Sequence, residues 1–245
     1  MKDSRHAAGH GPFVVPKDRA TGCLPRVSQP GEWCPLASEY IPIIPRSDWE
    51  DLLGKVNNSG LCWWGALDQD GVGSCGAEGC AGAVMAGREL SGLGRVKLNP
   101  WYLYHFTSGG VDHGSSIDDN LRVARDRGIA SMDVWPRSHG WRTAPSEEAH
   151  EDAKRYRIEE FYDIRTSEEL ASALFLGFVV EFGYRIGAGG HAVFATDMVS
   201  TTRFRFKNSW GADWNGDGFG ELNLTDIYWG FGAWALRVPS WDEVI

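Results

Sequence analysis

The sequence KNSWG at residues 207–211 decides the expected fold when it is read together with two stretches that precede it. The first is GGHAV at residues 189–193, and the second, far upstream, is QDGVGSC at residues 69–75. In chain order they supply a glutamine, a cysteine, a histidine and an asparagine. Acyl transfer to a thiolate needs a nucleophile, a base, a group that orients the base, and a donor for the oxyanion. The three stretches therefore indicate a nucleophilic cysteine site.

Cys75 stands where a Gly-Ser turn leads into an expected helix. Apolar residues recur there at the helical positions i, i+3, i+4, i+7 and i+8, namely Ala77, Cys80, Ala81, Val84 and Met85. Small residues form a second stripe, so we expect a central helix buried on two sides. Because a helix N-terminus offers partial positive charge and free N–H groups, we expect it to lower the pKa of the Cys75 thiol. The alternative is that Cys75 is an ordinary core residue.

The other members of the expected site are His191, Asn208 and Gln69. His191 opens an apolar strand beside flexible glycines, where it can exchange protons with a thiol and a leaving amine. The Asn208 amide oxygen can accept a hydrogen bond from the imidazole, and Trp210 can cover that bond. Gln69, six residues before Cys75, can hold an oxyanion together with the Cys75 backbone N–H. For each residue, the alternative is an ordinary turn or core position.

These motifs resemble those of the papain-like cysteine peptidases, over roughly residues 45 to 240. The resemblance implies an α+β, two-lobed fold. A helical left domain would carry Cys75, and an antiparallel, β-barrel-like right domain would carry His191 and Asn208. A substrate cleft would lie between them, and Cys75, His191, Asn208 and Gln69 would be the catalytic residues.

The chain departs from the familiar family pattern in ways that indicate a divergent microbial or viral type. Gly76 stands where many members have tryptophan, and Val72 stands where a family disulfide cysteine would be. The separation between Cys75 and His191 is shorter than the roughly 130–150 residues typical of the family. The N-terminal arm is also shorter than the long helical prosegment of the lysosomal type.

Substrate contacts are expected from Gly110, Gly114, Gly190 and Trp210. The glycine-rich loop at residues 109–114 can offer a backbone edge to an extended peptide, although a plain surface loop is the alternative. No metal site is expected. Residues 213–218 imitate the start of a calcium loop, but Leu224 stands where the bidentate glutamate should be.

We expect three segments along the chain. Residues 1–45 form an irregular N-terminal arm rich in proline, which is either a surface extension or a short inhibitory prosegment. Residues 46–140 form the helical lobe with the nucleophile, and residues 141–245 form the β-rich lobe with the histidine and asparagine. Capping residues predict further helices over 117–127 and 167–176. Short apolar runs predict strands over 157–162, 178–184, 191–198, 203–208, 220–224 and 234–238.

Composition limits the partners. The formal net charge of −9 argues against nucleic-acid binding, and the apolar stretches are shorter than a membrane span needs. The N-terminal residues lack the apolar core of a secretory signal, so the default compartment is cytoplasmic. The five cysteines are odd in number, so at least one thiol stays free if the others pair, and no CxxC pair predicts a zinc site. Since no secretion signal is seen, we expect reduced thiols, with two disulfides among Cys23, Cys34, Cys62 and Cys80 as the alternative.

The sequence thus predicts a cysteine endopeptidase or a related peptide-bond hydrolase. Its substrate is a peptide or protein, and it needs no cofactor. Two alternatives stay open: a catalytically silent papain-like scaffold that binds peptides or proteins, and a Cys-His amidase or transamidase. No feature of the sequence reports the oligomeric state.

Overall fold

Six strands form one antiparallel sheet within residues 13 and 15–238, the part of the chain that the computed structural model describes. The strand order is β1-β6-β2-β3-β4-β5, so β1 and β5 are the edges. The strands are β1 (Glu160–Ile164), β2 (Val179–Ile186), β3 (Gly189–Met198), β4 (Arg203–Lys207), β5 (Phe219–Asn223) and β6 (Ala233–Arg237). The two longest strands, β2 and β3, pair in register from Val180–Ala195 to Ile186–Gly189 and form a hairpin at the centre.

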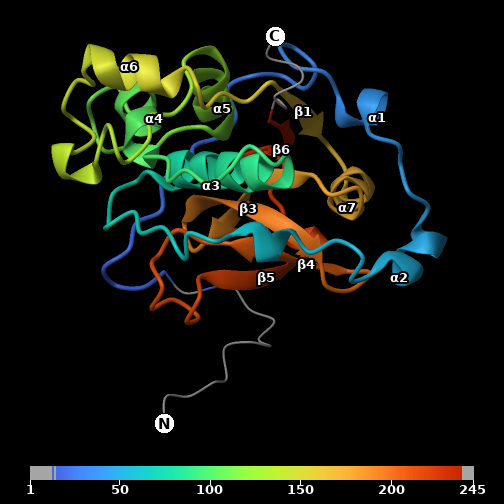
Figure 1. Cartoon of the computed structure of the whole chain (residues 1–245). Coiled ribbons are helices and arrows are strands. Elements are labelled where there is room, and N and C mark those ends of the chain that lie inside the picture. Colours follow the sequence, from blue (N-terminus) through green and yellow to red (C-terminus); the bar gives the residue numbers. More distant parts are fainter. Residues whose placement is uncertain (1–12, 14, 239–245) are drawn as a thin grey trace.

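Helices cover both faces of this sheet. They are α1 (Ala37–Tyr40), α2 (Trp49–Leu52), α3 (Cys75–Leu90), α4 (Pro100–Thr107), α5 (Ile117–Asp126), α6 (Glu147–Ala153) and α7 (Ser167–Phe175). In Figure 1, α3 crosses the middle of the molecule, with α4, α5 and α6 gathered on one side of it and α7 on the other. On β3, Ala192 and Phe194 pack with α3, whereas Val193 and Ala195 pack with α7. Because successive side chains of a strand point to opposite faces of the sheet, β3 contributes to the hydrophobic core on each face.

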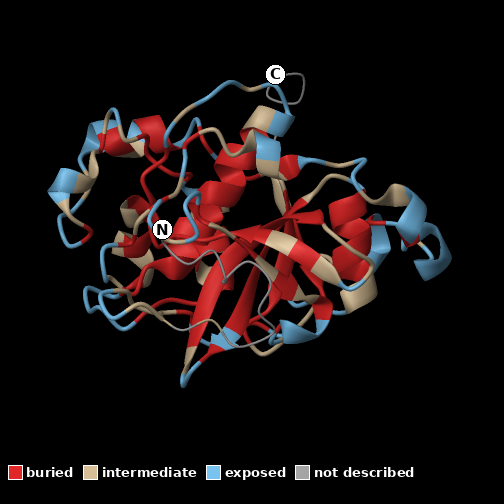
Figure 2. Ribbon diagram, turned by 90° about the horizontal axis from the view of Figure 1, so that it is seen from below, coloured by how far each residue is buried: buried red, intermediate tan, exposed pale blue. Residues whose placement is uncertain are grey.

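Helix α3 is the buried central helix that the sequence predicts. Every residue from Cys75 to Arg88 is buried. Its glycines allow the sheet to approach closely: a Cβ on Gly82 would lie 2.5 Å from the Phe194 ring, and one on Gly87 would lie 2.6 Å from Val238. Figure 2 shows this helix and the strands beneath it as the continuous buried part of the molecule.

The predicted elements agree with the structure, with small shifts at the ends and four omissions among the described helices. Ser116 and Thr166 cap α5 and α7 through their side-chain oxygens, as expected. The sequence analysis missed α1, which lies in the arm expected to be irregular, and α2, α4 and α6. Helix α4 carries a local signal, because Asn99 caps it and Pro100 occupies its first position, a common helix start. Strand β1 begins at Glu160, later than predicted, because the backbone groups of Tyr156 and Ile158 form hydrogen bonds with residues in and after helix α5 instead of with the sheet. Tyr156 O accepts from Ile129 N, and Ile158 N donates to Ala124 O.

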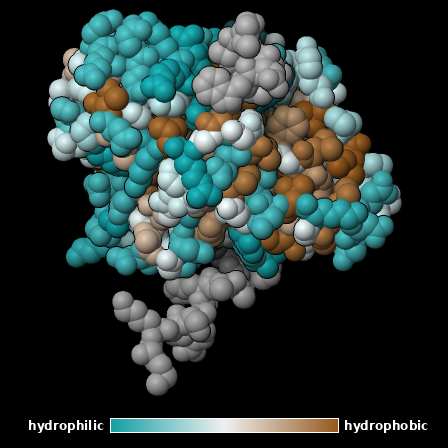
Figure 3. Space-filling model, in the orientation of Figure 1, coloured by the Kyte–Doolittle hydropathy of each residue, from teal (hydrophilic) through white to brown (hydrophobic). Residues whose placement is uncertain are grey.

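The surface differs between the two ends of the molecule. In Figure 3, hydrophilic residues cover the side that carries α4 and α6, and apolar residues gather on the side of α2 and α7. None of the described helices is long and apolar enough to cross a bilayer. The division of the chain near residues 45 and 140 stays a prediction.

Candidate active site

Cys75, His191 and Asn208 come together from three elements. Cys75 begins α3, His191 lies on β3, and Asn208 directly follows β4. His191 Nε2 lies 2.7 Å from Asn208 Oδ1. The Cys75 sulfur accepts a hydrogen bond from the backbone N–H of Ala192, the residue after the histidine. The antiparallel pairing of β3 with β4 explains why residues 17 apart meet.

The hydrogen bonds around Asn208 fix the protonation pattern of the histidine. Asn208 Oδ1 also accepts from the backbone N–H of Ser209, at 2.8 Å, so this amide atom must be the oxygen. The neutral His191 ring therefore donates from Nε2 and carries its lone pair on Nδ1. That Nδ1 atom is buried and has no hydrogen-bond partner among the described residues. The ring is thus arranged to accept a proton at Nδ1.

Trp210 covers this pair, as the sequence predicts. Its ring stacks on the His191 ring with centroids 4.4 Å apart and an interplanar angle of 26°. Both side chains are buried, with exposed fractions of 1% for Trp210 and 0% for His191. The indole therefore shields the imidazole–amide hydrogen bond from water, which strengthens it.

Gln69 lies at the same place and is held there by a residue that the sequence analysis missed. Its Oε1 accepts a 2.8 Å hydrogen bond from Ser209 Oγ. This bond turns the Nε2 group outward, where it donates to Val72 O at 2.7 Å and to Ala20 O at 3.1 Å. Ser209 belongs to the KNSWG stretch, but only the folded chain shows what its hydroxyl does.

Burial dominates the electrostatics of the site in this conformation. It raises the pKa of Cys75 to about 11, although N–H groups of Ala192, Gly22 and Gly76 oppose the shift. Burial also lowers the pKa of His191 to about 4, against the effect of the Asn208 hydrogen bond. The expectation of a lowered thiol pKa is therefore wrong for this conformation, because desolvation outweighs the helix N-terminus.

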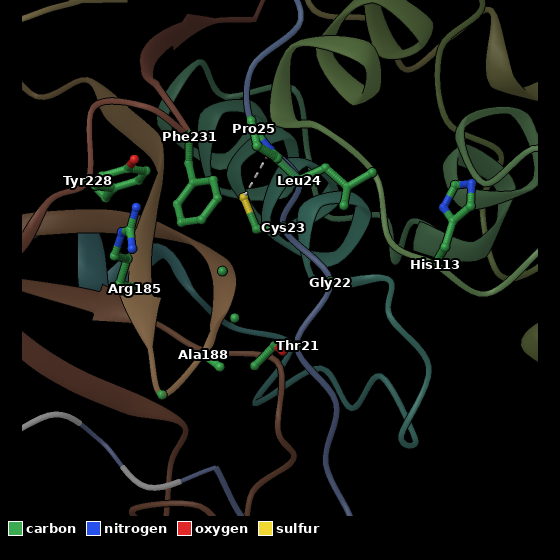
Figure 4. Close-up of a pocket in the computed structure, with 13 residues that line it drawn as sticks. Thr21, Gly22, Cys23, Leu24, Pro25, His113, Arg185, Ala188, Tyr228 and Phe231 are labelled. Atoms are coloured by element: carbon green, nitrogen blue, oxygen red, sulfur yellow. Dashed lines mark hydrogen bonds between the residues drawn. The ribbon is translucent and has the colours of Figure 1, made fainter.

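The N-terminal arm covers the site. Gly22 N and Cys23 N both donate to Gly190 O, at 3.2 and 3.0 Å. On the opposite side, Ser115 N donates to Gly22 O at 2.9 Å, and Leu24 N donates to Ser115 O at 3.1 Å. The arm thus lies between the β2–β3 hairpin and the loop that precedes α5 (Figure 4).

The arm is also bound at its preceding residues. Ala20 O accepts from Gln69 Nε2 and, at 3.3 Å, from Trp210 Nε1. Arg19 forms an ion pair with Asp68 at 2.9 Å and donates to Trp210 O at 3.3 Å. The carbonyl of Ala20 therefore takes up an N–H of the Gln69 amide. Residues 19–24 thus contact the predicted site, and their role as an inhibitory prosegment stays a prediction.

Gly22 is the residue that lets the arm cross Cys75. A Cβ on Gly22 would lie 2.1 Å from Gly73 O, and one on Gly114 would lie 2.2 Å from Gly22 O. Real Cβ atoms essentially never come within 3.0 Å of a heavy atom outside their own residue and its two chain neighbours. The three glycines thus meet backbone to backbone, so a side chain has no room there.

Three of the four residues expected to contact substrate touch the arm, and one does not. Gly114, Gly190 and Trp210 all touch the arm. Gly110 does not: a Cβ built on it would meet no atom within 4 Å, so this glycine lies in open space. Within the loop at residues 109–114, Asp112 Oδ1 accepts from Gly73 N at 2.9 Å, and His113 lines the cavity beside the arm.

Gly76, the chief departure from the family pattern, has a local explanation. A Cβ on Gly76 would lie 2.8 Å from Asn120 Nδ2, which donates to Ser115 Oγ and Ser116 O. The space beside the nucleophile is therefore filled by helix α5 rather than by a tryptophan on α3.

All five cysteines are free, and all five lie in the described range. Across residues 13 and 15–238, no group of three or more histidine, cysteine or acidic side chains is arranged to hold a metal ion.

Several solved structures share this architecture. Xylellain, a cysteine protease from Xylella fastidiosa, matches with a TM-score of 0.70 over 93% of this chain and 100% of its own, at 20% sequence identity. Procathepsin B S9 from Trypanosoma congolense matches with a TM-score of 0.61 over 91% of this chain and 88% of its own, at 17% identity. The digestive procathepsin L 3 of Tenebrio molitor larval midgut matches at 0.62, over 75% and 69%, at 16% identity. This chain has the papain-like fold.

The papain-like fold confirms the fold class that the sequence motifs predict, a mixed arrangement of helices and an antiparallel sheet. No family model matches the chain, and no curated protein matches it in sequence. At the low identities of the structural matches, the shared feature is the fold, and the chemistry has to be argued from the site itself.

Proposed function

We propose that this protein is a cysteine peptidase that uses Cys75 as nucleophile, His191 as proton carrier and Asn208 as the residue that orients the histidine. The observation that carries the proposal is the convergence of these three side chains with Gln69 at the N-terminus of α3. No single stretch of the chain holds them together, so their meeting is a property of the fold.

In this mechanism, His191 Nδ1 takes the proton from the Cys75 thiol, and the sulfur attacks the peptide carbonyl carbon. Gln69 Nε2 and the Cys75 backbone N–H stabilise the oxyanion. The protonated histidine then gives its proton to the leaving amine, and water hydrolyses the thioester. Asn208 holds the ring in place through Nε2 while the charge on the imidazole changes.

The conformation with the arm in place is inactive in this proposal, for two reasons. The Ala20 carbonyl engages Gln69, and both members of the cysteine–histidine pair are held neutral by burial. Departure of the arm rehydrates the site. Since desolvation is the largest cause of both shifts, rehydration lowers the thiol pKa and raises the imidazole pKa, which favours the ion pair.

The arm also runs through the site in the opposite N-to-C direction to a substrate, so it is not positioned for cleavage. His191 must protonate the leaving amine, and Trp210 stacks on His191, so the leaving half of a substrate lies on the Trp210 side. The acyl half, which precedes the cleaved bond, then extends toward Gly190 and Ser115. The arm runs the other way, because residues 19–20 contact Trp210 and residues 23–24 contact Gly190 and Ser115. An N–H group of Gly22, rather than a carbonyl carbon, faces the sulfur.

The test is hydrolysis of a broad panel of fluorogenic peptides by the full-length protein in reductant. The rates of wild type and Gly22→Ala are compared with those of the same two proteins carrying Cys75→Ala. In Gly22→Ala the added methyl group clashes with Gly73 and should displace the arm. Cys62→Ala, at a half-buried thiol outside the cleft, is the matched control. We expect turnover that Cys75→Ala abolishes and Cys62→Ala keeps.

Absence of Cys75-dependent turnover in both backgrounds would refute the proposal. If peptides then still bind, the chain is a silent scaffold. If Cys75 acts on side-chain amides and spares peptide bonds, as mass spectrometry of the products would reveal, the chain is an amidase.

A further inference from the structure

The side chain of Cys23 is buried on the acyl side of the cleft, at the edge of an open cavity of about 460 Å³ that Gly190, Arg185 and Phe231 also line. Its exposed fraction is only 4%. Its sulfur lies 3.2 Å from the position that a Cβ on Gly183 would take, so it sits directly on strand β2. In Figure 4 this side chain points toward Phe231, whereas the next one, Leu24, points toward the side of His113. Cys23 therefore lies against strand β2 and Phe231, and a larger side chain pointing the same way would meet them.

Phe231 forms one wall of this cavity by covering two glycines of the β2–β3 hairpin. A Cβ on Gly183 would lie 2.4 Å from Phe231 Cβ, and one on Gly190 would lie 2.4 Å from Phe231 Cζ. Because these glycines have no side chains, the Phe231 ring packs directly on the sheet. It occupies the volume that side chains at positions 183 and 190 would otherwise fill. The exposed fraction of Phe231 is 7%.

This wall belongs to the body of the protein and not to the arm. The loop that carries Phe231 is fixed to β2, because Tyr228 N donates to Gly183 O and Gly183 N donates to Gly232 O, both at 3.1 Å. The Tyr228 ring packs edge-on against Phe231 with centroids 4.9 Å apart. The wall therefore keeps its place when the arm leaves.

The arm shows which substrate residue faces this wall. Gly22 lies at the sulfur, so it marks the place of the substrate residue that carries the cleaved carbonyl. Cys23 lies one residue farther toward the Gly190 and Ser115 side, where the acyl half of a substrate extends. Although the arm has the opposite polarity, the spacing between successive residues along an extended chain is the same. The place of Cys23 therefore corresponds to the second residue before the cleaved bond.

We propose that this cleft selects peptides with a small side chain (glycine, alanine, serine or cysteine) at the second residue before the cleaved bond, because Phe231 fills the space over Gly183 and Gly190 that this side chain points into. The inference rests on the proposed peptidase function and adds a substrate class to it. Leucine or phenylalanine at that position would have to displace a ring that the sheet and the loop hold in place, and overpacking of this kind is strongly disfavoured.

The experiment measures kcat/KM for a set of otherwise identical fluorogenic peptides that carry Gly, Ala, Ser, Leu, Phe or Arg at that position. The full-length protein can be used directly, because a fraction of molecules with the arm in place lowers all rates equally and leaves their ratios unchanged. For wild type we expect kcat/KM to be about 10-fold or more higher for the alanine peptide than for the leucine peptide. A side chain that is too large by one methylene or more lowers kcat/KM by at least about that factor. Phe231→Ala should shift the ratio toward leucine by a similar factor.

Two further variants make the result unambiguous. Phe231→Leu keeps an apolar core residue and should shift the ratio partway, which tests the inference if Phe231→Ala does not fold. Phe106→Ala removes a half-buried ring outside the cleft and should leave the ratio unchanged. Equal or faster cleavage of the peptide with leucine at the second residue before the cleaved bond in wild type, or an unchanged ratio in both Phe231 variants, would overturn the inference. No cleavage of any peptide would instead count against the peptidase function.

Discussion

Replacing Gly22 by alanine should release the arm from the nucleophile. The backbone angles of Gly22 are open to any residue, because its φ is not positive, so the effect comes from space alone. The added Cβ would lie 2.1 Å from Gly73 O and 2.5 Å from Gly73 C. These are backbone atoms, and Asp112 Oδ1 holds the Gly73 N–H at 2.9 Å. The clash therefore cannot be relieved by turning a side chain.

The size of the effect follows from the cost of overpacking. Inserting a methyl group into a tight contact costs about 1–3 kcal/mol. If that cost falls on the state with the arm in place, the fraction of molecules with an open cleft rises about 5- to 150-fold. Hydrogen bonds of the arm to Gly190, Ser115 and Gln69 contribute about 0.5–1.5 kcal/mol each and keep the closed state populated in wild type.

Alkylation of Cys75 by iodoacetamide measures the open fraction, because the closed site buries the thiol completely, with 0% exposed. The rate, followed by peptide mass spectrometry, should rise by the same 5- to 150-fold in Gly22→Ala. Gly60→Ala is the matched control, since its added methyl group meets only the movable amide tip of Asn57. A wild-type rate in Gly22→Ala, with the protein folded, would refute this account of how the arm is held, as would a buried Cys75 that reacts in wild type like a free thiol.

Three further predictions concern the site. Asn208→Ala should lower kcat by about 10- to 100-fold with a smaller effect on thermal stability, because it removes the hydrogen bond to a histidine that becomes charged during turnover; an equal loss of stability and activity in calorimetry and kinetics would contradict it. Gln69→Ala should lower kcat about 100-fold, and Ser209→Ala about 5-fold, because the serine only orients the amide; a larger effect of the serine variant in steady-state kinetics would argue against this order. His191 has a pKa of about 4 in the closed state and about 6.5 when unfolded, so stability present above pH 6.5 should be lost as the pH falls toward 4, on the order of 3 kcal/mol in total. Melting temperatures between pH 7 and 5 should fall less in His191→Gln, and equal pH slopes would refute this assignment. The raised pKa of Cys75 acts in the opposite direction, with stability lost as the pH rises from about 9 to about 11.

Much of the site could be predicted because its residues stand in stretches with local signals. Cys75 follows a turn and opens a helix with a clear apolar period, and Asn208 ends a strand of alternating residues. Helix α4 also had a local signal, in Asn99 and Pro100, that the sequence analysis overlooked. Nothing local marks Phe231 as the wall of a pocket, because its role depends on glycines at positions 183 and 190 on other strands.

The pKa values mark the clearest limit of sequence reasoning. A helix N-terminus favours a thiolate, and the sequence locates that terminus correctly at Cys75. The sequence does not reveal how much water reaches the sulfur. The arm removes that water, and desolvation then outweighs the helix terminus.

The amino-acid sequence alone determined the order of the glutamine, cysteine, histidine and asparagine, the helical and β-rich parts of the chain, and hence the papain-like fold. These features are local or periodic, so they can be read from neighbouring residues. Only the tertiary structure decided that the arm crosses the nucleophile at Gly22, that Ser209 orients Gln69, and that Phe231 limits the pocket. Each of these depends on contacts between residues far apart in the chain, where distances of a few tenths of an ångström decide what fits.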